Sequence, residues 1–261
     1  MSIQQNMVMD SFFEHLKKAS ASVLFLDYDG TLAPFCIERD KAYPYPGVCA
    51  LLEKILFSSR THLVLISGRR PLDLISLLNL PTHPEIWGSH GWERCLPDGT
   101  CQIGKIDELC LKGLVEADAW IEEKGWISYI EQKPACMALH VRGMDKNKAV
   151  QILQEAKEKW LVLAKETGLQ LLAFDGGLEL RAPGRNKGTA VETVLSEVGP
   201  QTQVAYLGDD LTDEDAFKVI KKNGLAILVR SDFRNTSADI WLKPPEELLE
   251  FLARWADAVQ A

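Results

Sequence analysis

The chain has 261 residues, a formal net charge of -8 and a pI near 5.2. With 46% hydrophobic and 25% charged residues it is typical of a globular protein that forms one large domain or two small ones. The acidic balance provides no basic surface for nucleic acid or an anionic membrane, and no apolar run approaches the ~20 residues of a membrane helix. We therefore expect neither kind of partner.

Residues 1–20 lack the apolar centre of a signal peptide and predict a short amphipathic helix instead. A chain of this length can form its own core without disulfides, and its six cysteines show no CxxC pair and no zinc-finger spacing. We expect reduced, mostly buried thiols in a cytoplasmic protein. The six residues are Cys36, Cys49, Cys95, Cys101, Cys110 and Cys136.

The first apolar run, residues 23–26, leads directly into Asp27, Asp29 and Gly30. A short continuous apolar run predicts a strand buried on both faces, as in a parallel sheet. Two ionised carboxylates this close repel each other unless a cation or a shared proton compensates. The alternative is an ordinary turn, because Asp and Gly are common turn residues.

Strands and helices alternate on both sides of a different middle section. This alternation predicts a parallel sheet covered by helices, with a proline-rich loop at 34–47. Thr212 is expected to cap the helix that follows the strand at 204–207. The other expected strands are 63–66, 86–88, 225–229 and 240–242, and the expected helices are 48–58 and those beginning near 71, 187 and 244.

The middle section begins after the turn signal Pro97-Asp98-Gly99 and has the order helix, two strands, helix, two strands. Hairpin turns predict an antiparallel sheet with two helices. We therefore expect a smaller α+β domain at 99–183, inserted into a core formed by 1–98 and 184–261. Its elements are a helix at 106–125, strands at 127–133 and 136–142, a helix capped by Asp145, and a hairpin of 171–174 with 178–182 around Asp175.

Polar residues follow three of the buried strands. In open α/β sheets, ligands bind outside the carboxyl ends of the strands. Carboxylates and water are what Mg²⁺ prefers, with substrate phosphate completing its coordination. Alone, each residue has an ordinary explanation, such as a turn or a helix cap, but together they predict a metal-plus-phosphate site in which a carboxylate can act as nucleophile. These residues are Asp27, Asp29, Ser67, Asp209, Asp210 and Lys187, which opens a helix.

The order of these motifs resembles the haloacid dehalogenase superfamily of phosphatases. The motifs are Asp27-Tyr28-Asp29-Gly30-Thr31, Ser67-Gly68-Arg69, Lys187, and Gly208-Asp209-Asp210 followed by Thr212-Asp213. The resemblance implies an α/β fold: a Rossmann-like parallel-sheet hydrolase core with an inserted cap domain.

The resemblance also implies a role for each motif residue. Asp27 would be the nucleophile, and Asp29 would protonate the leaving oxygen, activate water and place its carbonyl on the metal. Lys187 would pair with Asp27 and the phosphate. Ser67 would bind a phosphoryl oxygen. Asp209 would complete the Mg²⁺ ligands, supported by Asp210 and Asp213.

Within the superfamily, longer stretches resemble the trehalose-6-phosphate phosphatase family: residues 24–34, 66–69, 90–91, 186–188 and 208–217. In the cap, the pairs Glu131 with Lys133, His140 with Arg142, and Glu179 with Arg181 would each share a strand face, as a hydroxyl-rich ligand requires. The alternative is the ordinary solvated face of an antiparallel sheet. Of the cap residues, Glu131, Lys133 and Glu179 match the places where that family holds the sugar. The candidate substrate-binding residues are Ser67, Gly68, Arg69, His90, Glu131, Lys133, His140, Arg142 and Glu179.

The resemblance implies a Mg²⁺-dependent phosphatase that hydrolyses trehalose 6-phosphate through an aspartyl phosphate, and we expect it to be a cytoplasmic monomer. Its partner would be a small phosphorylated sugar. Glucosylglycerol phosphate or mannosyl-3-phosphoglycerate would be the alternative substrates, and a phosphomutase is disfavoured because nothing indicates exclusion of water from a phosphoenzyme. A non-catalytic sugar-phosphate sensor is a further alternative, although such a protein could lose Asp27, Asp29 or Asp209, and all three are present.

Overall fold

The computed structural model describes residues 3–36, 38–174 and 176–260, and the chain divides into two compact units. The core ends at Gln102 and resumes at Asn186, and the cap is Ile103–Arg185. The sequence placed these limits at 99 and 183. The first limit lies later because strand β5 (Cys101–Ile103) extends the core sheet, and its first two residues still belong to the core.

The core contains an eight-stranded sheet in the order β12-β11-β10-β1-β2-β3-β4-β5. The strands from β12 to β3 are parallel, and β4 runs antiparallel to β3. All five residues of the central strand β1 are buried, which confirms the prediction of a strand covered on both faces. The bounds are β1 Ser22–Leu26, β2 Thr61–Ile66, β3 Glu85–Gly88, β4 Glu93–Cys95, β10 Gln203–Gly208, β11 Leu225–Val229 and β12 Ile240–Leu242.

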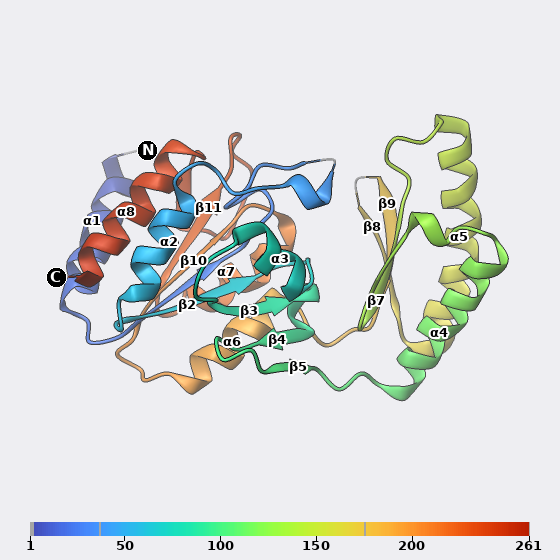
Figure 1. The fold of residues 1–261 in the computed structure, drawn as a ribbon, viewed down its shortest axis with the longest axis horizontal. Coiled ribbons are helices and arrows are strands. Elements are labelled where there is room, and N and C mark those ends of the chain that lie inside the picture. The colour runs from blue at the N-terminus through green and yellow to red at the C-terminus, as the bar shows by residue number, and fades with distance from the viewer. Residues whose placement is uncertain (1–2, 37, 175, 261) are drawn as a thin grey trace. The chain divides into compact units, whose positions relative to one another are not determined.

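Helices cover both faces of this sheet, as alternating strands and helices require. Leu24 and Leu26 of β1 join a hydrophobic cluster with α1, α2, α3 and α8, while Val23 and Phe25 join a second cluster with α6 and α7. Figure 1 shows α1, α8 and α2 grouped together. The helices are α1 Ile3–Lys18, α2 Val48–Phe57, α3 Pro71–Leu78, α6 Lys187–Glu197, α7 Glu214–Ile220 and α8 Glu246–Gln260, with 3₁₀ turns η1 Arg39–Lys41, η2 Ser89–Gly91 and η4 Leu211–Asp213.

The cap contains a four-stranded antiparallel sheet in the order β6-β7-β9-β8. Two helices pack against it, and Asp145 caps the second as predicted, with Oδ1 accepting from Asn147 N–H and Lys148 N–H. Asp175, at the predicted hairpin turn, lies outside the described residues. The elements are α4 Glu108–Glu123, η3 Ile127–Tyr129, β6 Ile130–Lys133, β7 Cys136–His140, α5 Lys146–Thr167, β8 Gln170–Phe174 and β9 Gly177–Arg181.

Three local predictions were wrong. The strand expected from 127 begins only at Ile130, because a 3₁₀ turn precedes it. Strand β7 ends at His140, so Arg142 lies in an exposed turn and does not share a strand face with His140. The N-cap residue after β10 is Asp210 and not Thr212. Asp210 Oδ1 accepts from Leu211 N–H, and a 3₁₀ turn precedes α7.

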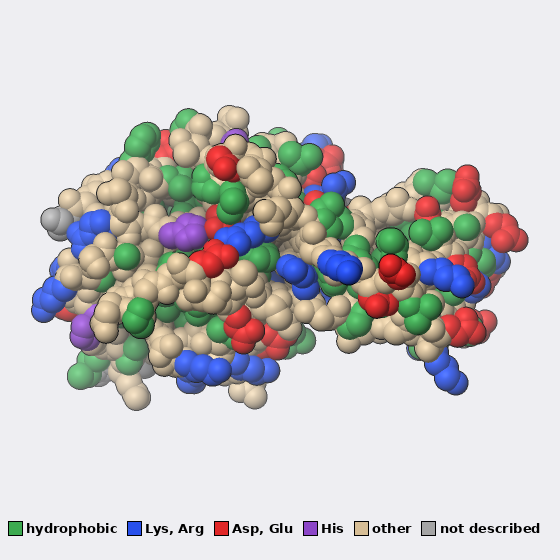
Figure 2. Space-filling model, turned by 90° about the horizontal axis from the view of Figure 1, so that it is seen from below, with side chains coloured by type: hydrophobic (Ala, Val, Ile, Leu, Met, Phe, Trp, Pro, Cys, Tyr) green, Lys and Arg blue, Asp and Glu red, His purple; other side chains and the backbone are tan. Residues whose placement is uncertain are grey.

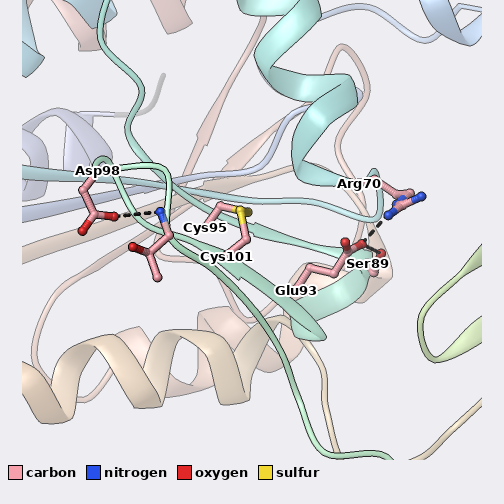
Figure 3. Close-up of a disulfide and its surroundings, with 7 residues drawn as sticks. Arg70, Ser89, Glu93, Cys95, Asp98 and Cys101 are labelled. Atoms are coloured by element: carbon pink, nitrogen blue, oxygen red, sulfur yellow. Dashed lines mark hydrogen bonds and ion pairs between the residues drawn. A yellow bond between two sulfur atoms is a disulfide. The ribbon is translucent and has the colours of Figure 1, made fainter.

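The prediction of six reduced cysteines was also wrong: Cys95 and Cys101 form a disulfide, with their Cα atoms 4.1 Å apart (Figure 3). A tight turn brings them together, since Leu96 N–H donates to Thr100 O at 2.9 Å and Asp98 accepts from Thr100 N–H at 2.8 Å. The sequence indicated the turn at 97–99 but not the two strands beside it, because β4 contains two charged residues and all three residues of β5 are exposed, so neither shows an apolar run. Of the unpaired cysteines, Cys110 and Cys136 are buried, while Cys36 and Cys49 are partly exposed.

Within the ranges that the structure describes, no helix combines the length and apolar character needed to cross a membrane. On the face shown in Figure 2, lysine and arginine side chains are mixed with acidic ones on both units. That face therefore carries no continuous basic field of the kind that binds a nucleic-acid backbone.

Candidate active site

Asp27 lies directly after β1, with its backbone N–H bonded to Leu207 O of β10 at 2.8 Å. The chain then turns through Gly30, whose φ of 81° is readily available only to glycine. A Cβ at Gly30 would collide with the Asp209 carboxylate. The glycine after the two aspartates therefore has a specific reason: it allows the loop after β10 to approach the loop after β1.

Lys187 joins two buried carboxylates at this edge of the sheet. Its Nζ lies 2.6 Å from Asp27 Oδ1 and 2.7 Å from Asp213 Oδ1, and all three side chains are at most 4% exposed. Asn186 caps the helix that Lys187 opens, which fixes where the lysine side chain begins. Burial lowers the pKa of Lys187, but Asp213 and Asp27 outweigh it and raise that pKa overall, so the ammonium stays charged.

Asp213 supports the loop after β10. Its Oδ1 also accepts from the Tyr206 hydroxyl at 2.5 Å, and its Oδ2 accepts from the backbone N–H groups of Asp209 at 3.2 Å and Asp210 at 3.0 Å. Both oxygens are therefore occupied by protein donors. This arrangement leaves Asp27 and Asp209, rather than Asp213, with carboxylate oxygens to offer a ligand.

The cluster carries more negative than positive charge. Carboxylate oxygens of Asp27, Asp209 and Asp213 lie within 4.8 Å of one another, and among the described residues the Lys187 ammonium is the one cation bonded to them. Asp209 Oδ2 is buried and has no hydrogen-bond partner among the described residues. Burial, reinforced by the neighbouring carboxylates, raises the pKa values of Asp209 and Asp27, and Lys187 opposes this effect at both residues. A divalent cation between Asp27 and Asp209 would fit this donor set and compensate the excess charge.

Asp29 is held by Arg69. The arginine donates from Nε to Asp29 Oδ2 and from Nη2 to Asp29 Oδ1, both at 2.7 Å, and from Nη1 to Arg39 O at 2.8 Å. Arg69 is only 4% exposed, whereas the Asp29 side chain is 30% exposed. The sequence placed Arg69 among the substrate-binding residues. In this structure its guanidinium is directed to the second aspartate of the first motif.

Ser67, Gly68 and His90 lie together where β2 and β3 end. Ser67 is buried; its N–H donates to Trp87 O at 2.8 Å and its Oγ accepts from Arg69 N–H at 3.1 Å. His90 N–H donates to Ser67 O at 3.0 Å, and a Cβ at Gly68 would lie 2.7 Å from the His90 ring. The structure thus joins the loops that carry these residues.

In the cap, polar residues gather on one face of the sheet. Lys133 Nζ lies 3.3 Å and His140 Nε2 lies 3.2 Å from Glu131 carboxylate oxygens. Ala138 pairs with both Glu131 and Glu179, so the two glutamates flank it on the same face. Arg181 Nη1 lies 3.8 Å from Glu179 Oε2. Five of the proposed polar residues are brought together, and Arg142 is not on these strands.

Two residues at the core site were not identified from the sequence. Tyr206 was treated only as part of a buried apolar strand, although a tyrosine at 0% exposure normally needs a partner for its hydroxyl. Arg234 lies after β11 and donates to backbone carbonyls of the 209–210 loop. Its only sequence signal was its place beyond the end of another parallel strand.

A protein-family model described as trehalose-phosphatase matches residues 25–243. The chain is 30% identical over 246 residues to a trehalose-phosphate phosphatase of Mycobacterium marinum, covering 89% of this chain and 61% of that protein. It is 32% identical over 274 residues to the probable trehalose-phosphate phosphatase H of Arabidopsis thaliana, covering 94% of this chain and 75% of that one.

Among solved structures, the fold is similar to the C-terminal domain of C. albicans trehalose-6-phosphate phosphatase, with a TM-score of 0.77 and 21% identity. That similarity covers 95% of this chain and 96% of the other, and it concerns the fold alone. The family match covers well over half of the residues and includes all the core motifs. This chain belongs to the trehalose-phosphatase family.

Proposed function

We propose that this chain is a Mg²⁺-dependent phosphatase that hydrolyses trehalose 6-phosphate to trehalose and phosphate through an aspartyl-phosphate intermediate. The observation that carries the proposal is the buried Asp27 carboxylate, bonded to Lys187 with the Asp209 carboxylate beside it. Family membership supports the reaction class. The chain spans 61% of the length of its Mycobacterium relative, so the activity of the whole protein is part of the proposal.

In the first step an oxygen of Asp27 attacks phosphorus, and the bond from phosphorus to the sugar oxygen breaks. Lys187 already bonds Asp27 Oδ1, while Oδ2 accepts, among the described residues, only from the Thr31 hydroxyl at 3.3 Å. The geometry therefore favours Oδ2 as the attacking atom. Asp29 gives a proton to the departing sugar oxygen. Asp29 then takes a proton from water, the water oxygen attacks phosphorus, and the bond to Asp27 breaks to release phosphate.

Mg²⁺ would be held by Asp27, Asp209 and the Asp29 carbonyl, and would neutralise charge on the phosphoryl group. The buried Asp209 Oδ2 without a protein partner supports this assignment. Lys187 supplies the second positive charge, so that an anionic phosphate can approach an anionic nucleophile. Arg69 orients the Asp29 carboxylate through its two bonds.

We assign recognition of the sugar to the polar face of the cap sheet. Glu131 and Glu179 provide carboxylate acceptors for sugar hydroxyls. Lys133, His140 and Arg181 orient these carboxylates or donate hydrogen bonds to the sugar. These groups suit a hydroxyl-rich ligand in general. Another glycosyl phosphate is therefore the second candidate substrate.

The test is phosphate release from trehalose 6-phosphate, glucosylglycerol phosphate and mannosyl-3-phosphoglycerate, each with and without Mg²⁺. We expect the trehalose ester to give the highest kcat/KM and chelation to abolish turnover. A higher kcat/KM for another ester would reassign the sugar, and turnover that survives chelation would contradict the metal.

The nucleophile is tested by Asp27→Asn. We expect phosphate release to fall by about 10³-fold or more. An amide is a far weaker nucleophile than a carboxylate, and without the aspartyl phosphate the hydrolysis step has no substrate. The melting temperature should not fall, since the substitution removes charge from a cluster with excess carboxylates. Substantial turnover by this variant would contradict the aspartyl-phosphate mechanism.

A further inference from the structure

The loop that carries Asp209 is tied down on two sides. Asp213 Oδ2 accepts from the backbone N–H groups of Asp209 and Asp210. Arg234 donates to the carbonyls of the same two residues, from Nε to Asp209 O at 3.1 Å and from Nη2 to Asp210 O at 2.7 Å. Two successive peptide groups are thus held through both their donors and their acceptors.

Arg234 is itself fixed in place. Its Nη1 pairs with Glu214 and donates to Asn235 O at 3.0 Å. Glu214 also accepts from the Thr236 hydroxyl at 2.7 Å and from Ser237 N–H at 2.8 Å. The guanidinium therefore bridges the segment after β11, the start of α7 and the Asp209 loop, and both partners of the ion pair are only 16% exposed.

This arrangement matters because the Asp209 carboxylate is not anchored at both oxygens. Asp209 Oδ2 has no hydrogen-bond partner among the residues described, so its position depends on the backbone from which it projects. Arg230 approaches the Asp209 carbonyl only at 3.5 Å, the outer limit of a hydrogen bond. Arg234 is consequently the main side-chain donor to the acceptor side of this loop.

We propose that Arg234 is a positioning residue that holds the Asp209 carboxylate in the geometry required for a divalent cation. The inference rests on the proposed function, since it takes Asp209 as a cation ligand. Arg234 acts through the backbone, because it bonds the carbonyls of Asp209 and Asp210 rather than the carboxylates of Asp27 or Asp209. Its planar fork is what allows two adjacent carbonyls and a carboxylate to be bound at once.

The test is a titration of the metal-free chain with Mn²⁺, in which the electron paramagnetic resonance signal of the free ion measures the Kd. We expect Arg234→Met to weaken the Kd by about tenfold, the lower end of the effect of residues that orient metal ligands. Arg234→Lys should recover part of the loss, because an ammonium can reach one carbonyl but cannot form the fork. The Arg234→Lys variant also serves as the test if Arg234→Met does not fold.

The matched control is Arg94→Met. Arg94 is another partly buried arginine, bonded to Glu85 and Glu197 in the core but not to the Asp209 loop. The Arg94→Met substitution should lower the melting temperature and leave the Mn²⁺ Kd unchanged. Equal Kd values for wild type, Arg234→Met and Arg234→Lys would overturn the positioning role of Arg234 and leave the proposed function standing. Absence of Mn²⁺ binding by the wild type would overturn the metal assignment of the proposed function as well.

Discussion

At the scale of single residues, the core site consists of buried charges with specific partners. Asp213 uses both carboxylate oxygens on Lys187, Tyr206 and two backbone N–H groups. A buried carboxylate is costly unless it is paired and hydrogen-bonded, and Asp213 satisfies that condition entirely within the protein. Asp209 does not, because its Oδ2 is buried without a protein partner in the described part of the chain. This contrast separates a supporting aspartate from one suited to bind a cation.

Arg69 gives a prediction at this scale. Arg69→Lys should lower kcat for the proposed phosphatase reaction by about 10²-fold with little change in KM, because an ammonium cannot hold both oxygens of Asp29 and the proton shuttle loses its orientation. Steady-state kinetics with trehalose 6-phosphate measures the two constants separately. A raised KM with unchanged kcat would instead support the substrate-binding role that the sequence assigned to Arg69.

At the scale of elements, the end of the core sheet farthest from β12 is held by covalent and ionic links. The disulfide joins β4 to β5, and Glu93 of β4 accepts from the Ser89 hydroxyl at 2.6 Å (Figure 3). Arg94 of β4 binds Glu85 of β3 at 2.8 Å and pairs with Glu197 of α6. These links compensate for the short strands, which form few ladder hydrogen bonds of their own.

The disulfide leads to a stability prediction. Cys101→Ser should lower the free energy of unfolding by roughly 2 kcal/mol, because the bond closes a loop between residues only six apart and constrains the unfolded chain modestly. Urea unfolding with and without reductant measures this. Reductant should destabilise the wild type but not Cys101→Ser, and Cys36→Ser should keep the full response. A wild type that ignores reductant would show that the pair is not oxidised in solution.

Glu85 leads to a pH prediction. Burial raises the pKa of Glu85, but donors from His62, Arg94 and Trp87 outweigh it and lower that pKa below 4.5. A depressed pKa in the folded state stabilises the fold above the unfolded value, and that contribution is lost as pH falls through the folded value. Glu85→Gln should therefore lower the free energy of unfolding at neutral pH, by about 1.5–3 kcal/mol, the range for lost hydrogen bonds to a charged group. Urea unfolding at several pH values should show the gap to the wild type closing under acid conditions, whereas a constant gap would contradict an ionised Glu85.

At the scale of the whole molecule, the two units carry different kinds of residues. The core holds the buried carboxylates and Lys187, which suit phosphoryl transfer, and the cap holds a polar sheet face. Ile130, Gln132, Met137 and Leu139 alternate with the polar positions, and the helices α4 and α5 pack on the cap sheet. The polar face is therefore available for a role other than packing.

The cap assignment predicts a substrate-selective effect of Glu131→Ala. We expect kcat/KM for trehalose 6-phosphate to fall roughly 10–100-fold, the range for a lost hydrogen bond to a charged group, with little change for p-nitrophenyl phosphate. Gln132→Ala is the matched control, because Gln132 points to the other face and bonds Asp118 of α4. Equal losses on both esters in Glu131→Ala would show that this residue does not contact the sugar.

Much of the fold followed from local patterns. Buried parallel strands are continuous apolar runs, so β1, β2, β10 and β11 were predicted close to their observed limits. Strands β4 and β5 were missed because neither carries an apolar run: β4 is Glu93-Arg94-Cys95 and the three residues of β5 are exposed, whereas the equally short β12 is wholly apolar and was predicted. Arg142 was placed on β7 because alternation in sequence does not show where a strand ends.

The sequence by itself determined which chemical groups stand at the ends of the parallel strands, because chain order and strand direction place those ends at one edge of a sheet. Only the tertiary structure decided how the groups pair. Lys187 meets Asp27 across 160 positions of chain, Arg69 meets Asp29 across 40, and Arg234 meets the Asp209 carbonyl across 25. Such contacts depend on packing between elements distant in sequence, and no local period or motif spacing records them.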